Sequence, residues 1–240
     1  MERVGMEMVV EEILSRLPSK TVGRFRCACK QWRYELSTHM CAIIHARQMA
    51  NSQNRKLITF TYLSVVIDNV VDGKIGFFAR KNISFPIFTP PPPLFLNIIA
   101  SLYGFLLIST EHPSNKLLLW NPTTTRCLFL LHENSDSIYL NSVDTAEMYL
   151  DASNDLKILH IKRCNDVVVS RVYSRCTGTW RTIDFLKGTP FGSRIYTWSV
   201  GTLSNNKLYF TVSHYWLCDS SYIIAFDVNS EVFNRVTLPQ

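Results

Sequence analysis

The sequence of 240 residues has few of the paired cysteines and histidines that build metal sites or disulfide frameworks. Its seven cysteines are an odd number, they form no C-x-x-C pair, and only Cys27 and Cys29 lie close together. The six histidines are isolated, and no H-E-x-x-H motif occurs. Zinc sites and disulfide-stapled domains both need such residues at fixed spacings. We therefore expect no bound metal, no cofactor and no disulfide framework.

Signatures of catalysis and phosphate binding are missing as well. The sequence has no G-x-S-x-G nucleophile elbow, no P-loop and no G-x-G-x-x-G motif, each of which supports a specific backbone geometry at a reactive or phosphate group. The run GTPFGS at residues 188–193 has too few glycines and too much bulk to cradle a phosphate. Nothing in the sequence argues for an enzyme.

A secretory signal is absent from the amino terminus. The run MERVGMEMVVEEIL places acidic side chains where such a signal has a basic region followed by an apolar run. The protein is therefore not expected to be secreted. We expect it in the cytoplasm, the nucleus or both, with reduced cysteines.

Charge is absent from residues 83–110, which raises the question of a membrane span. A spanning helix needs roughly 20 consecutive apolar residues. The apolar centre of this stretch, residues 94–108, is interrupted by polar residues and follows four prolines at positions 90–93. The pattern predicts two buried strands that meet at a turn near Tyr103 and Gly104, and no contact with a membrane.

The residues that are present favour β structure. Hydrophobic side chains make up 47% of the chain, enough for a sizeable core, and aromatic side chains make up 12%. Aromatic rings fit the half-buried surface of a pleated strand better than a long helical bundle. We expect a globular protein that consists mostly of sheet.

The net charge of +6 is concentrated near the amino terminus. Residues 1–15 carry four acids against Arg3, a net charge of −3, whereas residues 16–56 carry nine lysines or arginines against Glu35 alone, a net charge of +8. The remaining 184 residues have a net charge of +1. The basic segment could face nucleic acid, an acidic protein or solvent.

Helical spacing dominates the first 45 residues. The first apolar stripe is one face of a helix that ends at Pro18, and it consists of Met6, Val9, Val10, Ile13, Leu14 and Leu17. A second stripe follows a candidate N-cap at Ser19, and a break near residues 27–30 divides it into two helices. It consists of Val22, Phe25, Cys29, Trp32 and Leu36. Such a segment buries too little surface to be stable alone, so we expect it to pack on the rest of the chain or on another protein.

The second stripe argues against nucleic acid as the partner of this segment. Its apolar side chains need burial, and the basic residues between them are spread around the helices instead of lining one face. We therefore expect no binding of nucleic acid.

From residue 57 the pattern becomes strand-like, and it repeats itself. Three segments superpose without gaps, namely LLLWNPTTTRCLFL, SRVYSRCTGTWRTI and IIAFDVNSEVFNRV. Each copy reads as a strand that ends in an aromatic residue, a polar turn and a second strand. Two sets of landmark residues keep a spacing of 53 residues, and we expect each set to occupy equivalent inward positions. The first set is Trp120, Tyr173 and Phe226, and the second is Cys127, Trp180 and Phe233.

Another turn and strand lie upstream of each copy, after Gly104, Asp155 and Asn206. Each unit therefore has about four strands and about 50 residues, the size of a kelch-like propeller blade. The 184 residues after position 56 supply only about three and a half such blades, whereas propellers have about 4 to 8. We expect an incomplete, propeller-like array of antiparallel sheets whose ring does not close.

Two parts of the chain resemble the large plant F-box family. The run VVEEILSRLPSKTVGRFRCACKQWRYELS, residues 9–37, resembles the F-box, and the three hairpins resemble the F-box-associated domain that follows it in that family. The resemblance implies a multi-domain α+β fold, in which a small three-helix F-box precedes an all-β region of repeated antiparallel four-stranded units. It implies an F-box at residues 1–45, connecting strands at 46–95 and the F-box-associated region at 96–240.

The resemblance also implies a function, that of the substrate receptor in a Skp–cullin–F-box ubiquitin ligase. The F-box would bind a Skp-type adaptor and through it the cullin, while the β region would bind a target protein that the sequence does not identify. Acidic adaptors would favour a basic rim formed by Arg24, Lys30 and Arg33. The adaptor-facing positions, with the apolar anchors at their centre, would be Ile13, Leu14, Leu17, Pro18, Val22, Phe25, Arg26, Cys27, Cys29 and Trp32.

The sequence departs from the family pattern in two places. The Leu-Pro pair that usually opens the F-box falls on Gly5 and Met6, and the family's β region usually runs well beyond a third hairpin, whereas this chain ends at Gln240. A basic nucleic-acid-binding protein is the second alternative to a ligase receptor, and the first is a shortened protein-interaction module outside a ligase. Its β region would be marginal alone, and prone to self-association or dependent on a partner.

Overall fold

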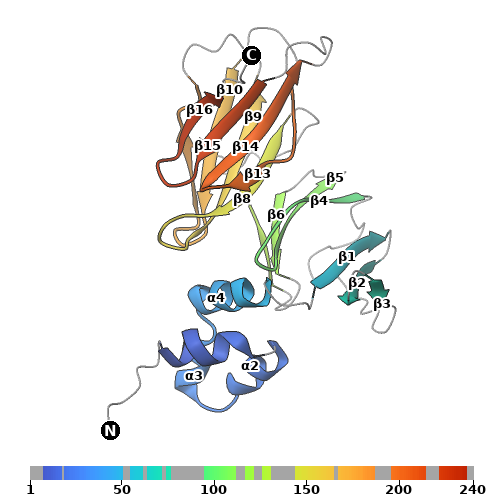
Figure 1. Ribbon diagram of the computed structural model, residues 1–240, viewed down its shortest axis with the longest axis vertical. Helices are drawn as coiled ribbons and strands as arrows, with labels where there is room; N and C mark the ends of the chain where they lie inside the picture. Colours follow the sequence, from blue (N-terminus) through green and yellow to red (C-terminus); the bar gives the residue numbers. More distant parts are fainter. Residues whose placement is uncertain are drawn as a thin grey trace. The chain divides into compact units, whose positions relative to one another are not determined.

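The chain divides into two compact units, Met1–Pro86 and Ile87–Gln240, and Figure 1 follows the chain through both. Within the described residues, the first unit contains short helices and one sheet, and the second contains three sheets. The computed structural model describes residues 8–17, 19–50, 55–61, 64–71, 74–76, 95–111, 117–121, 126–130, 144–164, 167–186, 196–214 and 222–236.

Helices in the first unit follow the predicted apolar stripes. The first stripe forms a π-helical turn, η1 (Val9–Ile13), which continues into a 3-10 turn, η2 (Leu14–Arg16). The second stripe forms α2 (Ser19–Phe25) and α3 (Lys30–Glu35), which are separated by the predicted break. A further helix, α4 (His39–Ala50), extends past residue 45.

A small core and two side-chain caps hold these helices together. The Sγ atom of Cys29 accepts a hydrogen bond from the backbone N–H of Trp32 at 3.4 Å, which caps α3 at the break. The Oγ1 atom of Thr38 accepts from the backbone N–H of Cys41 at 3.2 Å and caps α4 in the same way. The core consists of Leu14, Leu36 and Cys41, with Val9, Leu17, Val22, Phe25 and Trp32 packed against them.

The first unit ends in a three-stranded antiparallel sheet. Its strands β1 (Arg55–Thr61), β2 (Ser64–Val71) and β3 (Lys74–Gly76) pair in the order in which they occur in the sequence. The strand-like pattern that begins at residue 57 therefore does form strands.

Three antiparallel sheets make up the second unit, and each follows sequence order. The first contains β4 (Phe95–Leu102), β5 (Phe105–Glu111), β6 (Leu117–Asn121) and β7 (Arg126–Phe129). The second contains β8 (Thr145–Leu150), β9 (Leu156–Cys164), β10 (Val167–Ser174) and β11 (Thr179–Ile183). The third contains β12 (Tyr196–Trp198), β13 (Thr202–Ser204), β14 (Lys207–His214), β15 (Tyr222–Asp227) and β16 (Val232–Val236).

The third sheet has the same four strand positions as the other two. Its strands β12 and β13 both pair with β14, so they are the two halves of an interrupted first strand. The predicted fold class is confirmed: short helices precede repeated, antiparallel four-stranded units, which form no closed barrel within the described part of the chain.

The two landmark sets lie directly opposite each other on neighbouring strands. The pairs are Trp120 with Cys127, Tyr173 with Trp180, and Phe226 with Phe233. Each pair continues onto the preceding strand through a buried aliphatic residue, and these are Leu106, Ile158 and Leu208. Cys127 is partly exposed, and the other five landmarks are buried. The period of 53 residues is therefore a period of strand register as well as of sequence.

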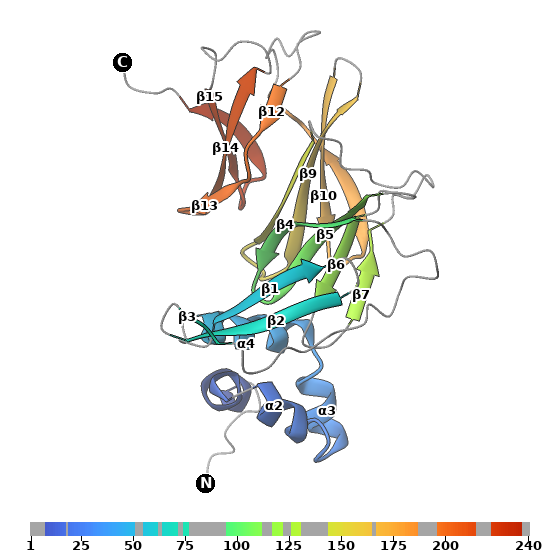
Figure 2. The same ribbon diagram turned by 90° about the vertical axis from the view of Figure 1, so that its right-hand side faces the viewer.

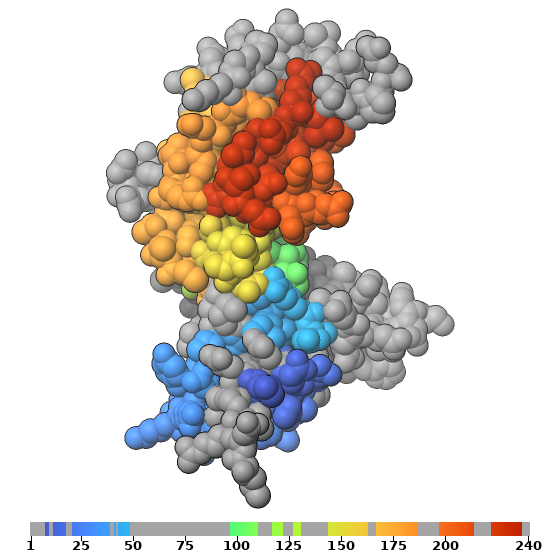
Figure 3. All heavy atoms as spheres, turned by 60° about the vertical axis from the view of Figure 1, so that its left-hand side comes forward, coloured from blue at the N-terminus to red at the C-terminus, as the bar shows by residue number. Residues whose placement is uncertain are grey.

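Neighbouring sheets of the second unit pack face to face. One core joins the first sheet to the second and includes Leu107, Leu117, Leu119, Met148, Ile158, Tyr173 and Trp180. Another core joins the opposite face of the second sheet to the third and includes Tyr149, Leu159, Val172, Phe210, Ile224, Phe226 and Phe233. Figure 2 shows the second and third sheets side by side, and their atoms adjoin in Figure 3. The second sheet is thus buried on both faces, as stacked propeller blades are.

Residues with a positive φ angle close two of the hairpins. Tyr103 and Gly104 connect β4 to β5, and Asn205 and Asn206 connect β13 to β14. Two consecutive left-handed residues are typical of the tight type I′ turn. The turn predicted near Tyr103 and Gly104 is confirmed. Among the described helices, none is long and apolar enough to cross a membrane.

Candidate functional site

The helical segment places the predicted adaptor-facing residues in three environments. Leu14 is only 3% exposed and belongs to the core. Ile13, its neighbour, is 55% exposed, and Cys27 and Cys29 in the break are exposed as well. The partly exposed residues are Leu17, Val22, Phe25, Arg26 and Trp32, and Pro18 lies outside the described residues.

Two aromatic rings connect the core to the surface of this segment. Phe25 and Trp32 stack across the break between α2 and α3, with ring centroids 5.1 Å apart and ring planes inclined by 29°. Both rings pack against the core and keep part of their surface exposed. Rigid aromatic side chains offer a large contact area and lose little conformational freedom on binding. The pair therefore both supports the helices and presents an apolar surface.

Two exposed apolar residues in the same segment escaped the sequence analysis. Met8 is 59% exposed and Tyr34 is 73% exposed. Neither belongs to an apolar stripe, so helical spacing gives no signal for them. Tyrosine and methionine are enriched in protein interfaces, and the residue types alone could have indicated them.

Three basic side chains of this segment are also exposed. Arg24, Lys30 and Arg33 are all exposed, and within the described part of the chain none of them takes part in an ion pair. Among the described side chains of this segment, one ion pair joins Arg16 to Glu12 at 2.6 Å, and both side chains are more than 60% exposed. An exposed pair of this kind contributes little to stability. The positive charge is therefore available to an acidic partner.

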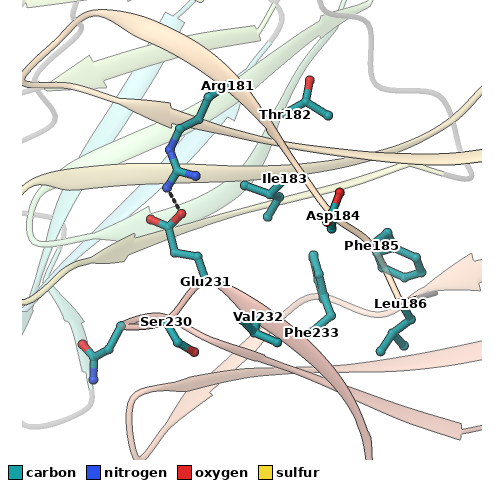
Figure 4. Close-up of a pocket in the computed structure, with 11 residues that line it drawn as sticks. Arg181, Thr182, Ile183, Asp184, Phe185, Leu186, Ser230, Glu231, Val232 and Phe233 are labelled. Atoms are coloured by element: carbon teal, nitrogen blue, oxygen red, sulfur yellow. Dashed lines mark ion pairs between the residues drawn. The ribbon is translucent and has the colours of Figure 1, made fainter.

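The second unit has a groove between its second and third sheets. The groove has a volume of about 820 Å³. One wall consists of residues 181–186, from β11 and the segment after it, and the other consists of residues 229–233, from the turn before β16 and its first residues. Figure 4 shows Arg181 reaching toward Glu231 at one end, while Phe185 and Phe233 approach each other at the other end. Their ring centroids lie 4.7 Å apart.

Glu231 fixes one wall of the groove to the second sheet. Its side chain is 10% exposed and forms ion pairs with Lys157, at 2.9 Å, and with Arg181. The hydroxyl group of Tyr149 donates a further hydrogen bond to Oε1 of Glu231 at 3.2 Å. Lys157 also pairs with Asp151 at 2.9 Å. Through Tyr149, Lys157 and Arg181 the network links the β15–β16 turn to strands β8, β9 and β11 of the second sheet. It therefore holds the two walls of the groove together.

A buried carboxylate makes a second joint between these sheets. Glu147 on β8 is buried, and its Oε2 atom accepts a hydrogen bond from the backbone N–H of Gly201 at 3.1 Å. Burial raises the pKa of Glu147 to about 7, against the lowering effect of the backbone N–H groups of Met148 and Gly201. A β-carbon at Gly201 would lie 2.8 Å from the ring of Phe210 and 2.9 Å from Cγ of Glu147. A residue larger than glycine would fit here only if these side chains moved.

The described residues contain no group of three or more His, Cys, Asp or Glu side chains that could hold a metal ion. Cys27, Cys29, Cys41, Cys127 and Cys176 are free thiols. What the two units offer is surface for other molecules: an apolar, basic-rimmed surface on the helices and a groove between two sheets.

Two family models match the chain. The F-box domain model matches residues 9–39, which cover η1, η2, α2 and α3. The model of the F-box associated beta propeller domain matches residues 93–240, which cover the three sheets of the second unit. The two matches lie one after the other along the chain.

Several curated proteins of Arabidopsis thaliana are similar to nearly the whole chain. One putative F-box protein is 25% identical and matches 97% of this chain and 59% of its own length. A second putative F-box protein is 26% identical and matches 99% of this chain and 50% of its own length. An F-box/kelch-repeat protein is 23% identical and matches 96% of this chain and 64% of its own length. The chain therefore spans about half to two thirds of the length of these relatives.

Among solved structures, a puromycin-hydrolysing peptidase of Mycobacterium tuberculosis has a TM-score of 0.42 at 10% identity, over 77% of this chain and 27% of the peptidase. This similarity is too low to support an argument about fold or function.

Proposed function

The chain belongs to the F-box proteins that carry an F-box-associated β-propeller domain, and from this membership we propose that it is the substrate receptor of a Skp–cullin–F-box ubiquitin ligase. The helical segment binds a Skp-type adaptor, and through it the cullin. The three sheets bind the target protein. The chain acts by binding and does no chemistry itself, and it works in the cytoplasm or the nucleus.

The observation that carries this proposal is the exposed apolar surface of the helical segment. Ile13 is exposed, and Phe25 and Trp32 are exposed in part, although all three belong to the apolar stripes of a segment that matches the F-box. Apolar stripes are normally buried, so a stripe that leaves such residues on the surface favours a protein partner. Aromatic and branched anchors of this kind carry most of the energy of a protein interface.

Charge supports an acidic partner for this surface. Arg24, Lys30 and Arg33 are exposed in the same helical segment as the apolar residues, and an acidic adaptor would be attracted to them. Complementary charges speed the encounter of two proteins more than they tighten the final complex. The association rate should therefore depend on salt more strongly than the dissociation rate does.

The groove of the second unit supports target binding by the sheets. It is lined by β11 and β16, which lie at the ends of the second and third sheets and leave one edge of each sheet unpaired by any other described strand. Exposed strand edges and concave surfaces are both used to bind extended peptides. The target would therefore contact residues 181–186 and 229–233.

Reconstitution of the complex tests the proposal. The full chain is mixed with a purified Skp-type adaptor and a cullin–RING core, and the complex is followed by size-exclusion chromatography. The chain should elute with the core only when the adaptor is present. Ile13→Ala should reduce this co-elution, whereas Val167→Ala, which truncates a residue that is 63% exposed in the second unit, should not. A chain that never enters the complex contradicts the ligase function and leaves a protein-interaction module outside a ligase.

A further inference from the structure

A row of residues crosses the second sheet from its interior to its edge. His160 on β9 lies opposite Arg171 on β10, and Arg171 lies opposite Thr182 on β11. His160 is 2% exposed, Arg171 is partly exposed and Thr182 is exposed. Because β11 is the end strand of this sheet, the row runs from a buried imidazole to solvent. Trp180, two residues before Thr182, places its indole ring 6.2 Å from the imidazole ring.

Buried nitrogen atoms without hydrogen-bond partners gather along this row. They belong to three side chains of the second sheet: Nδ1 and Nε2 of His160, Nε of Arg171 and Nε1 of Trp180. These residues alternate with Val172 and Leu159, which face the third sheet, and so lie on the face that carries Ile158 and Tyr173. Most buried polar groups in proteins have partners. Several unpartnered donors on one face of one sheet therefore indicate a missing acceptor.

The same place has positive charge without a nearby acid. Arg171 takes part in no ion pair within the described part of the chain. Burial, together with the charges of Lys162 and Arg171, lowers the pKa of His160 to about 3, with no acidic group acting in the opposite direction. The imidazole is therefore neutral at pH 7 and keeps one N–H donor.

Water and an oxyanion would satisfy these groups to different extents. A buried donor without a partner destabilises the folded chain, and an ordered water molecule would remove that cost. Water does not offset the charge of a partly buried guanidinium group. An oxyanion accepts several hydrogen bonds and supplies the opposite charge, which makes its hydrogen bonds to arginine short and strong.

We propose that His160, Arg171 and Trp180 form a binding site for a small oxyanion, either a carboxylate or a phosphate group. The guanidinium group of Arg171, the indole N–H of Trp180 and the imidazole N–H of the buried His160 donate to its oxygen atoms. The anion enters from the edge strand β11, past Thr182. The site does not depend on adaptor binding. The oxyanion is either a free ion or an acidic or phosphorylated side chain of a bound peptide.

Inorganic phosphate is the probe that tests this site in the full chain. Phosphate is titrated while sodium chloride keeps the ionic strength constant, and two signals are followed. The midpoint of thermal unfolding should rise and saturate. The indole N–H signal of Trp180 in the nuclear magnetic resonance spectrum, identified by its loss in Trp180→Phe, should shift with the same saturation.

Arginine variants give the decisive comparison. Arg171→Gln should weaken phosphate binding about tenfold or more, since a charged hydrogen bond contributes about 1.5–3 kcal/mol. Arg235→Gln is the matched control, because Arg235 lies over the ring of Tyr222 in the third sheet, and it should bind as the wild type does. Arg171→Lys keeps the charge without the planar fork and should give an intermediate response, which is measurable even if the glutamine variant is unstable.

Two outcomes overturn the site. A wild-type chain that shows no saturable response has donors that are satisfied by water alone. A response that Arg171→Gln retains in full is a general effect of phosphate on protein stability.

Competition then identifies the source of a confirmed oxyanion. Displacement of phosphate by the blocked peptide acetyl-Gly-Glu-Gly-amide as well as by acetate means that it can arrive on a side chain, whereas displacement by acetate alone means a free ion.

Discussion

Glu231 occupies, in the turn of the third sheet, the position that Gly178 occupies in the second. Both residues have a positive φ angle, 56° for Glu231 and 71° for Gly178. Both backbone N–H groups donate to a carbonyl four residues earlier, that of Asp227 at 2.8 Å and that of Ser174 at 2.9 Å. A side chain in this conformation costs about 1–2 kcal/mol. The ion pairs of Glu231 with Lys157 and Arg181 offset that cost and add to the core that joins the third sheet to the second.

Glu231→Gln should therefore destabilise the chain. The substitution keeps the backbone strain and the size of the side chain but removes the charge that Lys157 and Arg181 share. We expect a loss of about 1–3 kcal/mol in the free energy of unfolding, measured by urea denaturation. Asp184→Asn is the control, because Asp184 is an exposed acid in the same groove. Equal stability of the two variants would show that Glu231 does not join the sheets.

Stability should fall as pH rises through the range in which Glu147 titrates. The pKa of Glu147 is raised from 4.5 to about 7 in the folded chain, so between these values the folded state binds more protons than the unfolded state. The contribution of Glu147 therefore makes the free energy of unfolding larger below this range than above it, by an amount on the order of 3 kcal/mol. The measurement compares the free energy of unfolding of the wild type with that of Glu147→Gln from about pH 5 to about pH 8.

The difference between these two proteins isolates Glu147, since His160 titrates in the opposite sense. The pKa of His160 is lowered to about 3, so its contribution is present above the ordinary value of 6.5 and is lost as pH falls. It is the same in both proteins. The free energy of unfolding of the wild type, relative to that of Glu147→Gln, should fall as pH rises. A difference that does not fall would contradict the buried state of Glu147.

Gly201→Ala should destabilise the joint between the second and third sheets. The added methyl group would meet the ring of Phe210 and the side chain of Glu147 at less than 3 Å, and overpacking of this kind costs about 1–3 kcal/mol. Gly23→Ala is the control, because nothing lies within 4 Å of a β-carbon at Gly23, which is in α2. That variant should be neutral or more stable by up to about 1 kcal/mol. Thermal unfolding of both variants separates the two effects, and a Gly201→Ala chain as stable as the wild type would contradict the close packing.

Local pattern predicted the repeat well because a blade is a local structure. Its hairpins are closed by short turns and its faces alternate with period two, so the spacing of Trp120, Tyr173 and Phe226 is visible in the sequence and recurs in the strand register. The contacts between blades have no such signal. Glu231 meets Lys157 across 74 residues, and no local pattern relates the two.

In the helical segment, the sequence pattern likewise did not show which of two neighbouring apolar residues is buried. Ile13 and Leu14 belong to one apolar stripe, and helical spacing treats them alike. The structure separates them, because the π-helical and 3-10 turns η1 and η2 rotate Leu14 into the core and leave Ile13 exposed. Which member of a stripe is left for a partner depends on this local change of helical pitch. The adaptor-facing residues themselves remain a prediction.

The central claim is that the helical segment binds a Skp-type adaptor. Measuring adaptor binding by variants of the neighbouring residues Ile13 and Leu14 tests it most directly. The full chain is titrated with a purified Skp-type adaptor by calorimetry, with circular dichroism as the check on folding. The wild type should bind at micromolar concentrations or below. Ile13→Ala should stay folded and lose roughly tenfold or more in affinity. Leu14→Ala should lose binding together with helical structure, since a buried leucine contributes about 2–5 kcal/mol. A folded wild-type chain that does not bind the adaptor at micromolar concentrations, or an Ile13→Ala variant with unchanged affinity, would contradict the account.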